Sequence, residues 1–116
     1  MKCPRIERIV NRLSKLKKLL PEKQRKEVRL YYGDKSMAGY TYINGTNRIY
    51  ICMKTNNINA LFFVCIHEYA HLLRNNTKHD KKFWDLFYKL VSIAMKNKLL
   101  ELDFENMELC GDILIH

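Results

Sequence analysis

Apolar residues near the N-terminus recur at intervals of three and four positions. They are Ile6, Ile9, Val10, Leu13, Leu16 and Leu20. This spacing places them on one face of a helix, so it predicts an amphipathic helix from about Pro4 to Leu20. Pro21 marks its end, because proline lacks the backbone N–H that a helix interior uses.

The pattern then changes from helical spacing to short segments rich in aromatic and β-branched residues. These segments are residues 28–32, 39–43 and 48–53. Asn44 and Gly45 separate the second segment from the third, and Asn-Gly between two such segments is a strong hairpin signal. The pattern therefore predicts a small antiparallel sheet with a hairpin, leading directly into the next helix.

Residues 59–74 are apolar on nearly every side, which predicts a buried central helix. The polar residues 75–78 are expected to end it. Asp80 is expected to cap a further helix that runs to about Asn97. Its apolar positions, which we assign to the core, are Phe83, Trp84, Phe87, Leu90, Val91 and Ala94. Residues 99–116 are expected to pack back across the helices.

These elements predict a single α+β domain spanning residues 1–116. The chain is 47% apolar and 28% charged, which is the balance of a globular protein. Its longest apolar run, residues 60–66, is too short to cross a bilayer, and its first residues carry no hydrophobic signal. We therefore expect a soluble intracellular monomer with no membrane contact. The four cysteines form no CxxC pair, so we expect reduced thiols, with Cys65 in the core.

The central helix contains His67-Glu68-Tyr69-Ala70-His71, which reads HExxH. Two histidines four positions apart project from the same helix face, so they can share one metal ion with Glu68 beside them. The alternative is a helix with two solvated histidines. The apolar surroundings favour the metal site, because burying these polar groups is costly unless an ion compensates them.

Hydrolytic zinc sites use three protein ligands and leave a fourth position for water. The other two histidines are His79 and His116. A turn at residues 75–78 allows His79 to return toward the metal, so the predicted zinc ligands are His67, His71 and His79. Glu68 would then act as the general base toward water and not as a ligand. These features predict a zinc-dependent endopeptidase.

Several features of such a site stay open at this stage. A gluzincin-like arrangement with Glu101 as the third ligand is an alternative. Tyr40 and Tyr42 are candidates for stabilising the oxyanion. A peptide substrate is expected to add as an extended strand to the edge of residues 49–53, where backbone hydrogen bonds would bind it with little sequence preference.

The positive charge is concentrated in the N-terminal third of the chain. Residues 1–35 hold 12 Lys and Arg against 4 Asp and Glu, which accounts for +8 of the total +9. Clustered basic side chains gain affinity for phosphates by releasing counterions, so DNA contact is predicted. The predicted contact residues are Lys15, Lys17, Lys18, Lys23, Arg25 and Lys26. The alternative is a solvated helix face, or a lysine excess that reflects codon usage.

The order of helix, hairpin, HExxH helix and downstream histidine resembles the WLM domain of the zincin superfamily, to which the SprT/Spartan proteases are related. The specific similarity lies in residues 67–71 and in the sequence HDKKFW at 79–84. Residues 37–51 resemble that family's glycine-containing hairpin, and residues 109–112 resemble a Cys-Gly element near the domain's end. Two departures are the long His71-to-His79 spacing and the replacement of the usual glycine by Asn75-Asn76.

The resemblance implies a minimal zincin-like domain that cleaves proteins crosslinked to DNA. It also implies a nuclear or otherwise DNA-associated location and stimulation by DNA. The rival class is a basic nucleic-acid-binding module whose zinc site is structural or vestigial.

Overall fold

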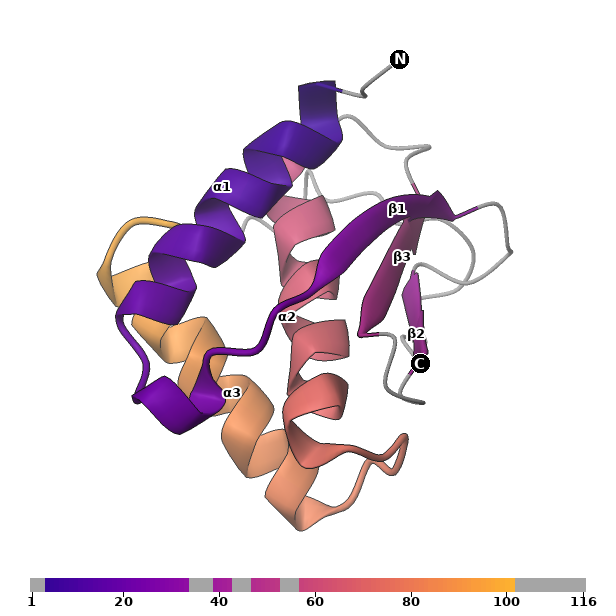
Figure 1. The fold of residues 1–116 in the computed structure, drawn as a ribbon. Coiled ribbons are helices and arrows are strands. Elements are labelled where there is room, and N and C mark those ends of the chain that lie inside the picture. Colours follow the sequence, from indigo (N-terminus) through magenta and orange to yellow (C-terminus); the bar gives the residue numbers. More distant parts are fainter. Residues whose placement is uncertain (1–3, 34–38, 43–46, 53–56, 102–116) are drawn as a thin grey trace.

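The computed structural model describes residues 4–33, 39–42, 47–52 and 57–101 (Figure 1). Their elements are α1 (Pro4–Lys18), the 3-10 turn η1 (Glu22–Gln24), β1 (Arg29–Gly33), β2 (Gly39–Tyr42), β3 (Arg48–Cys52), α2 (Ile58–Arg74) and α3 (Lys81–Lys96). The predicted α+β class is confirmed. The hairpin turn at residues 44–45, the Cys-Gly element at 109–112 and the expected packing of residues 102–116 lie outside the described residues.

The HExxH helix α2 lies at the centre of the fold, with the sheet on one side and α1 and α3 on the other (Figure 1). It begins where the Asn57 side chain accepts a hydrogen bond from the backbone N–H of Ala60, at 3.1 Å. Its side chains are buried over nearly their whole length, as the apolar sequence predicts. Polar groups on this helix are therefore held in a rigid and dry environment.

The sheet has the strand order β1-β3-β2, and it is mixed. β2 and β3 form the predicted antiparallel hairpin pair, with Tyr40 opposite Tyr50, but β1 pairs in parallel with β3, with Tyr31 opposite Tyr50. The prediction of a wholly antiparallel sheet is wrong. The chain reverses twice between β1 and β3, so these strands run in the same direction, and β1 pairs with β3 rather than with β2.

This strand order also corrects the predicted location of the substrate. β3 is the central strand, and both of its edges are occupied by β1 and β2. A peptide therefore has no free edge on residues 49–52. Among the described strands, the edges of the sheet are β1 and β2.

α1 ends two residues earlier than the sequence predicts. It closes in a turn in which the Leu19 N–H donates to the Leu16 carbonyl and the Leu20 N–H to the Lys17 carbonyl. On the apolar face Ile9, Leu13, Leu16 and Leu20 are buried, Ile6 is partly buried, and Val10 is 41% exposed. Val10 follows Ile9 by one position, about 100° around the helix, so it lies beside the buried face.

The cysteines differ from one another in environment. Cys65 is buried in α2 as a free thiol, which confirms its predicted place in the core, and burial raises its pKa. Cys52, which is buried at the end of β3, is disulfide-bonded, so the expectation of reduced thiols is wrong for this residue. No helix within the described residues is long and apolar enough to span a membrane.

Candidate metal centre

The central helix presents His67, Glu68 and His71 from its C-terminal half. Their side chains are almost fully buried, with exposed fractions of 1%, 0% and 0%. Because the two histidines are four residues apart, their rings lie on one face, with ring centroids 4.9 Å apart. The helix thus supplies two imidazoles and one carboxylate in a fixed arrangement.

A tight turn after α2 brings the third histidine back toward this face. Asn75 adopts the left-handed conformation with φ of 55°, and its N–H donates to the Leu72 carbonyl at 3.2 Å. The Asn76 N–H donates to the His71 carbonyl at 3.3 Å. These two bonds form a Schellman cap, in which asparagine replaces the more usual glycine. The Asn75-Asn76 departure from the WLM pattern is thus compatible with the turn that the site requires.

The three imidazoles converge through the same type of atom. Nε2 of His79 lies 3.2 Å from Nε2 of His67 and 3.1 Å from Nε2 of His71. Tetrahedral zinc binds imidazole nitrogens at about 2.0–2.1 Å, which separates any two of them by about 3.3–3.4 Å. The ligand set predicted from the sequence is therefore brought together at close to zinc-binding distances, and it can hold a metal ion.

Hydrogen bonding alone accounts poorly for this convergence. A neutral imidazole nitrogen either carries a proton or offers one in-plane lone pair, so Nε2 of His79 cannot make a well-aligned bond to both neighbours. A metal ion, in contrast, is suited to several lone pairs that point at one place.

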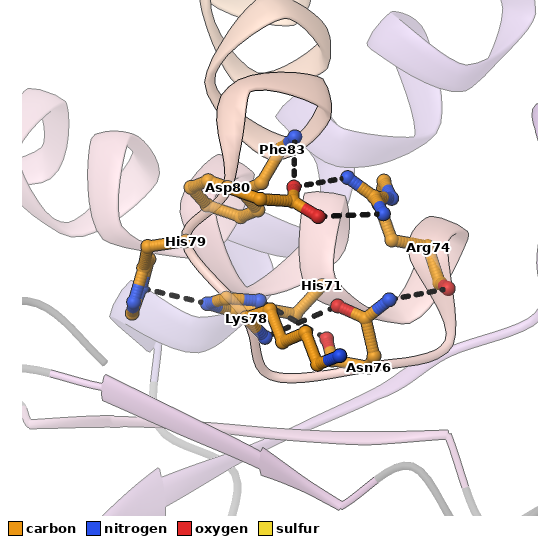
Figure 2. A network of polar contacts seen from close by, with 7 residues as sticks. All are labelled: His71, Arg74, Asn76, Lys78, His79, Asp80 and Phe83. Atoms are coloured by element: carbon orange, nitrogen blue, oxygen red, sulfur yellow. Dashed lines mark hydrogen bonds and ion pairs between the residues drawn. The ribbon is translucent and has the colours of Figure 1, made fainter.

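The tautomer of His71 supports the same conclusion. Its Nδ1 lies 3.2 Å from the carbonyl oxygen of Asn76, shown in Figure 2. A carbonyl can only accept, so Nδ1 carries the proton and Nε2 presents its lone pair to the site. Zinc-binding histidines usually have their second nitrogen fixed in this way.

Aromatic side chains of α3 form one wall of the site. Phe83 is buried and stacks on the His71 ring at 4.3 Å between centroids, and it meets the His67 ring edge-on at 4.9 Å. Trp84 stacks on His79 at 5.6 Å. The prediction that Phe83 belongs to the core is confirmed, and the same ring restricts the orientation of the histidines.

Glu68 lies beside the three histidines but is not part of the group that could hold a metal ion. Its Oε2 lies 3.9 Å from Nε2 of His67. Within the described part of the chain, neither carboxylate oxygen receives a hydrogen bond. Burial raises the pKa of Glu68 well above its ordinary value. A cation beside the carboxylate would offset that cost, which is a second reason to place a metal ion here.

A cavity of about 260 Å³ connects these groups with the sheet. It is lined by Tyr40, Thr41, Glu68, His71, Thr77 and His79. Glu68, His71 and His79 thus share one cavity with Tyr40 and Thr41 of β2.

Gly39 allows β2 to approach α2 at the cavity. A Cβ atom there would lie 2.5 Å from Cγ1 of Val64 and 3.3 Å from Cγ of Glu68. Successive side chains of a strand point to opposite faces of the sheet, so Tyr40 lies on the face opposite to Gly39. There its ring stacks on that of Tyr50, with 4.7 Å between centroids. Tyr40 also borders the cavity, and its role in stabilising an oxyanion stays a prediction. The Tyr42 side chain lies outside the described residues.

Gly39→Ala is expected to lower the free energy of unfolding of the metal-free protein by about 1–3 kcal/mol, because the added methyl overpacks the β2–α2 contact. Urea unfolding measures this. In a control cycle, Val64→Ala removes the Cγ1 atom, so the double variant should be destabilised by less than the sum of the two single variants. Strict additivity would show that the Cβ contact does not limit this packing.

The alternative third ligand, Glu101, is not near the histidines. Its backbone N–H donates to the Asn59 side chain at 3.0 Å, in the first turn of α2. Asn59 precedes His67 by eight residues, or about 12 Å along a helix axis. The metal-binding group found among the described residues consists of the three histidines, so Glu101 is not part of it.

The six predicted DNA-contact residues fall into two groups. Lys15, Lys18 and Lys23 are exposed, and Lys17 is half-buried. Arg25 and Lys26, in contrast, bind the ends of helices: the Arg25 guanidinium donates to the Leu20 carbonyl at 2.9 Å, and the Lys26 ammonium to the Leu72 carbonyl at 2.7 Å.

Comparison of the chain with family models, with curated proteins and with solved structures finds no match.

Proposed function

We propose that this protein is a zinc-dependent endopeptidase with a minimal zincin-like catalytic domain. The observation that carries the proposal is the convergence of three imidazole nitrogens, with Nε2 atoms 3.1 and 3.2 Å from that of His79, beside the buried Glu68. A structural zinc site commonly completes its coordination with four protein ligands. Among the described residues the group has three members, which leaves a position open, and two of them, His71 and His79, line a cavity.

Each group in the proposed site has a defined role. When bound, zinc supplies polarisation of the scissile carbonyl and a water molecule of lowered pKa. His67, His71 and His79 hold the ion through their Nε2 atoms. Glu68 accepts the proton of the attacking water and delivers it to the leaving amine, a role that suits a carboxylate whose pKa is raised by burial.

The proposed substrate site is the outer edge of β2. This strand packs on α2 through Gly39, and its Thr41 borders the cavity with Glu68. An extended peptide added to this edge would pass the ligands while being held by backbone hydrogen bonds. Such binding suits unfolded or extended protein segments of varied sequence. The direct test is cleavage of an unfolded peptide by the zinc-loaded protein, with Glu68→Gln as the inactive comparison.

Within the zincins, we propose a relationship to the WLM and SprT-like proteases, with DNA-bound or DNA-crosslinked proteins as substrates. The supporting features are the HExxH helix, the downstream His79, the Phe83-Trp84 pair and the exposed lysines of the N-terminal third. The rival proposal, a nucleic-acid-binding module with a structural zinc site, is supported by the basic charge alone. It predicts that Glu68→Gln leaves all function intact.

Charge reversal at Lys15, Lys18 and Lys23 is expected to weaken DNA binding without unfolding the protein, because these side chains are exposed. The slope of log affinity against log salt should fall by about 1 for each lysine that no longer binds a phosphate. Fluorescence anisotropy with labelled DNA over a salt series measures both effects. Arg25 and Lys26 are tested separately, because their substitution also removes bonds to helix ends.

Reversal of three exposed lysines on and just after α3, namely Lys89, Lys96 and Lys98, serves as the matched control for net charge. Equal weakening by both sets would indicate a response to total charge, not to a site near α1. Cleavage of a free unfolded peptide should persist in all these variants.

A further inference from the structure

The residue that ends α2 is joined to the residue that caps α3. The Arg74 guanidinium donates to Oδ1 of Asp80 at 2.5 Å and to Oδ2 at 3.2 Å, a two-bonded pair visible in Figure 2. Oδ1 of Asp80 also accepts the backbone N–H of Phe83 at 2.9 Å, which caps α3. Asp80 therefore links both helices, and it directly follows His79.

The connection between these helices is organised internally by Asn76. Its backbone carbonyl faces Nδ1 of His71 at 3.2 Å, and its side-chain oxygen accepts the Lys78 N–H at 3.1 Å (Figure 2). Asn76 thus contacts His71, the proposed ligand on the helix, and also the backbone of Lys78, which precedes His79. The Arg74–Asp80 pair closes this loop at its two ends.

The location of His79 makes such closure important. His67 and His71 are fixed by a buried helix, whereas His79 is exposed in the connection between two helices. A mobile ligand loses conformational freedom when it binds, and that loss reduces affinity. A loop that already holds His79 in the binding geometry avoids much of this loss of conformational freedom.

We propose that the Arg74–Asp80 pair is a positioning device that holds His79 in place for metal binding, and that it sets the zinc affinity of the site. The proposal rests on the zinc site assigned above. The hydrogen bonds of Arg74 and Asp80 described above do not reach the Nε2 atoms of the three histidines. Both residues would therefore act on His79 through the loop. Removal of a group that hydrogen-bonds a ligand directly changes metal affinity by about 10–100-fold, and we expect the lower end of this range for a pair that acts through the loop.

The two charges allow a sharp test, because simple electrostatics predicts opposite effects for them. Removal of a positive charge in Arg74→Gln would strengthen zinc binding through the field alone, and removal of a negative charge in Asp80→Ser would weaken it. A positioning role predicts that both variants bind zinc more weakly, by about 10-fold. Serine at position 80 retains the N-cap of α3 but is too short to make the two-bonded contact.

The measurement is the zinc dissociation constant of the whole protein, by competition with a chromophoric chelator. Arg74→Lys should recover part of the affinity, since lysine keeps the charge but not the paired geometry. The double variant should be little worse than either single one, because both remove the same contact. Asp85→Asn, at an exposed acid on α3, is the control for charge and should stay within about twofold of wild type.

Stronger zinc binding by Arg74→Gln, or affinities within twofold of wild type for both variants, would overturn the proposal. His79→Ala is measured in parallel. If it retains zinc, the ligand assignment itself is wrong. If it loses zinc while the pair is dispensable, only the positioning role fails. Circular dichroism of the metal-free variants shows that α2 and α3 are intact.

Discussion

Glu68→Gln is expected to abolish peptide cleavage by the zinc-loaded protein while zinc remains bound. Glutamine keeps the shape of the side chain but cannot accept the proton of the attacking water, and positioned general bases contribute about 10²–10⁴-fold to rates. The histidine ligands are unchanged, so the zinc content should match wild type. Cleavage of a quenched fluorescent peptide, with metal analysis of the same sample, measures both. Wild-type activity in this variant would rule out the assigned mechanism.

The stability of the metal-free protein provides an internal control for the Glu68 variant. Burial raises the pKa of Glu68 above its ordinary value of 4.5, so the folded state retains its proton to higher pH than the unfolded state does. The wild-type free energy of unfolding should therefore carry a term that is fully present below about pH 4.5 and is lost as pH rises toward the folded pKa. Glutamine lacks this term. The stability of Glu68→Gln relative to wild type should accordingly increase with pH.

His79→Ala is expected to lower zinc affinity by more than about 100-fold, above the range for removal of a supporting residue. The substitution removes one of the three converging nitrogens and leaves His67 and His71, the buried pair on α2, unchanged. Zinc added at about 100 times its dissociation constant should stabilise wild type by about 2.7 kcal/mol, and this stabilisation should disappear in the variant at the same concentration.

Glu101→Gln is the matched control for the ligand assignment. Glu101 lies against Asn59 at the opposite end of α2, so its substitution should leave zinc affinity unchanged. A result in which Glu101→Gln releases zinc and His79→Ala retains it would restore the gluzincin-like alternative.

The sequence predicts most of this architecture because local patterns determine it. The helical spacing from Ile9 to Leu16, the apolar stretch of α2 and the cap at Asp80 each depend on near neighbours, and all are present in the structure. The four-residue spacing of the HExxH histidines likewise follows from helix geometry. The helices and two of the three ligands can therefore be placed with few alternatives.

Features that depend on contacts between distant segments cannot be predicted in this way. Alternation identifies β1, but it does not specify which strand β1 joins, so it predicts neither the parallel pairing nor the central place of β3. The role of Gly39 depends on its distance from Val64 and Glu68 across two elements. The sequence predicts Asp80 as a helix cap, but its second contact, to Arg74, requires the turn at Asn75 that places the two residues side by side.

The proposed zinc site is tested most directly by the zinc content of the purified protein, measured by elemental analysis before and after chelation. We expect one zinc ion per chain in wild type, removed by chelator and restored by added zinc, and a marked loss in His67→Ala, His71→Ala and His79→Ala. Substoichiometric zinc in correctly folded wild type that cannot be raised by added zinc, or full zinc retention in His79→Ala, would contradict it.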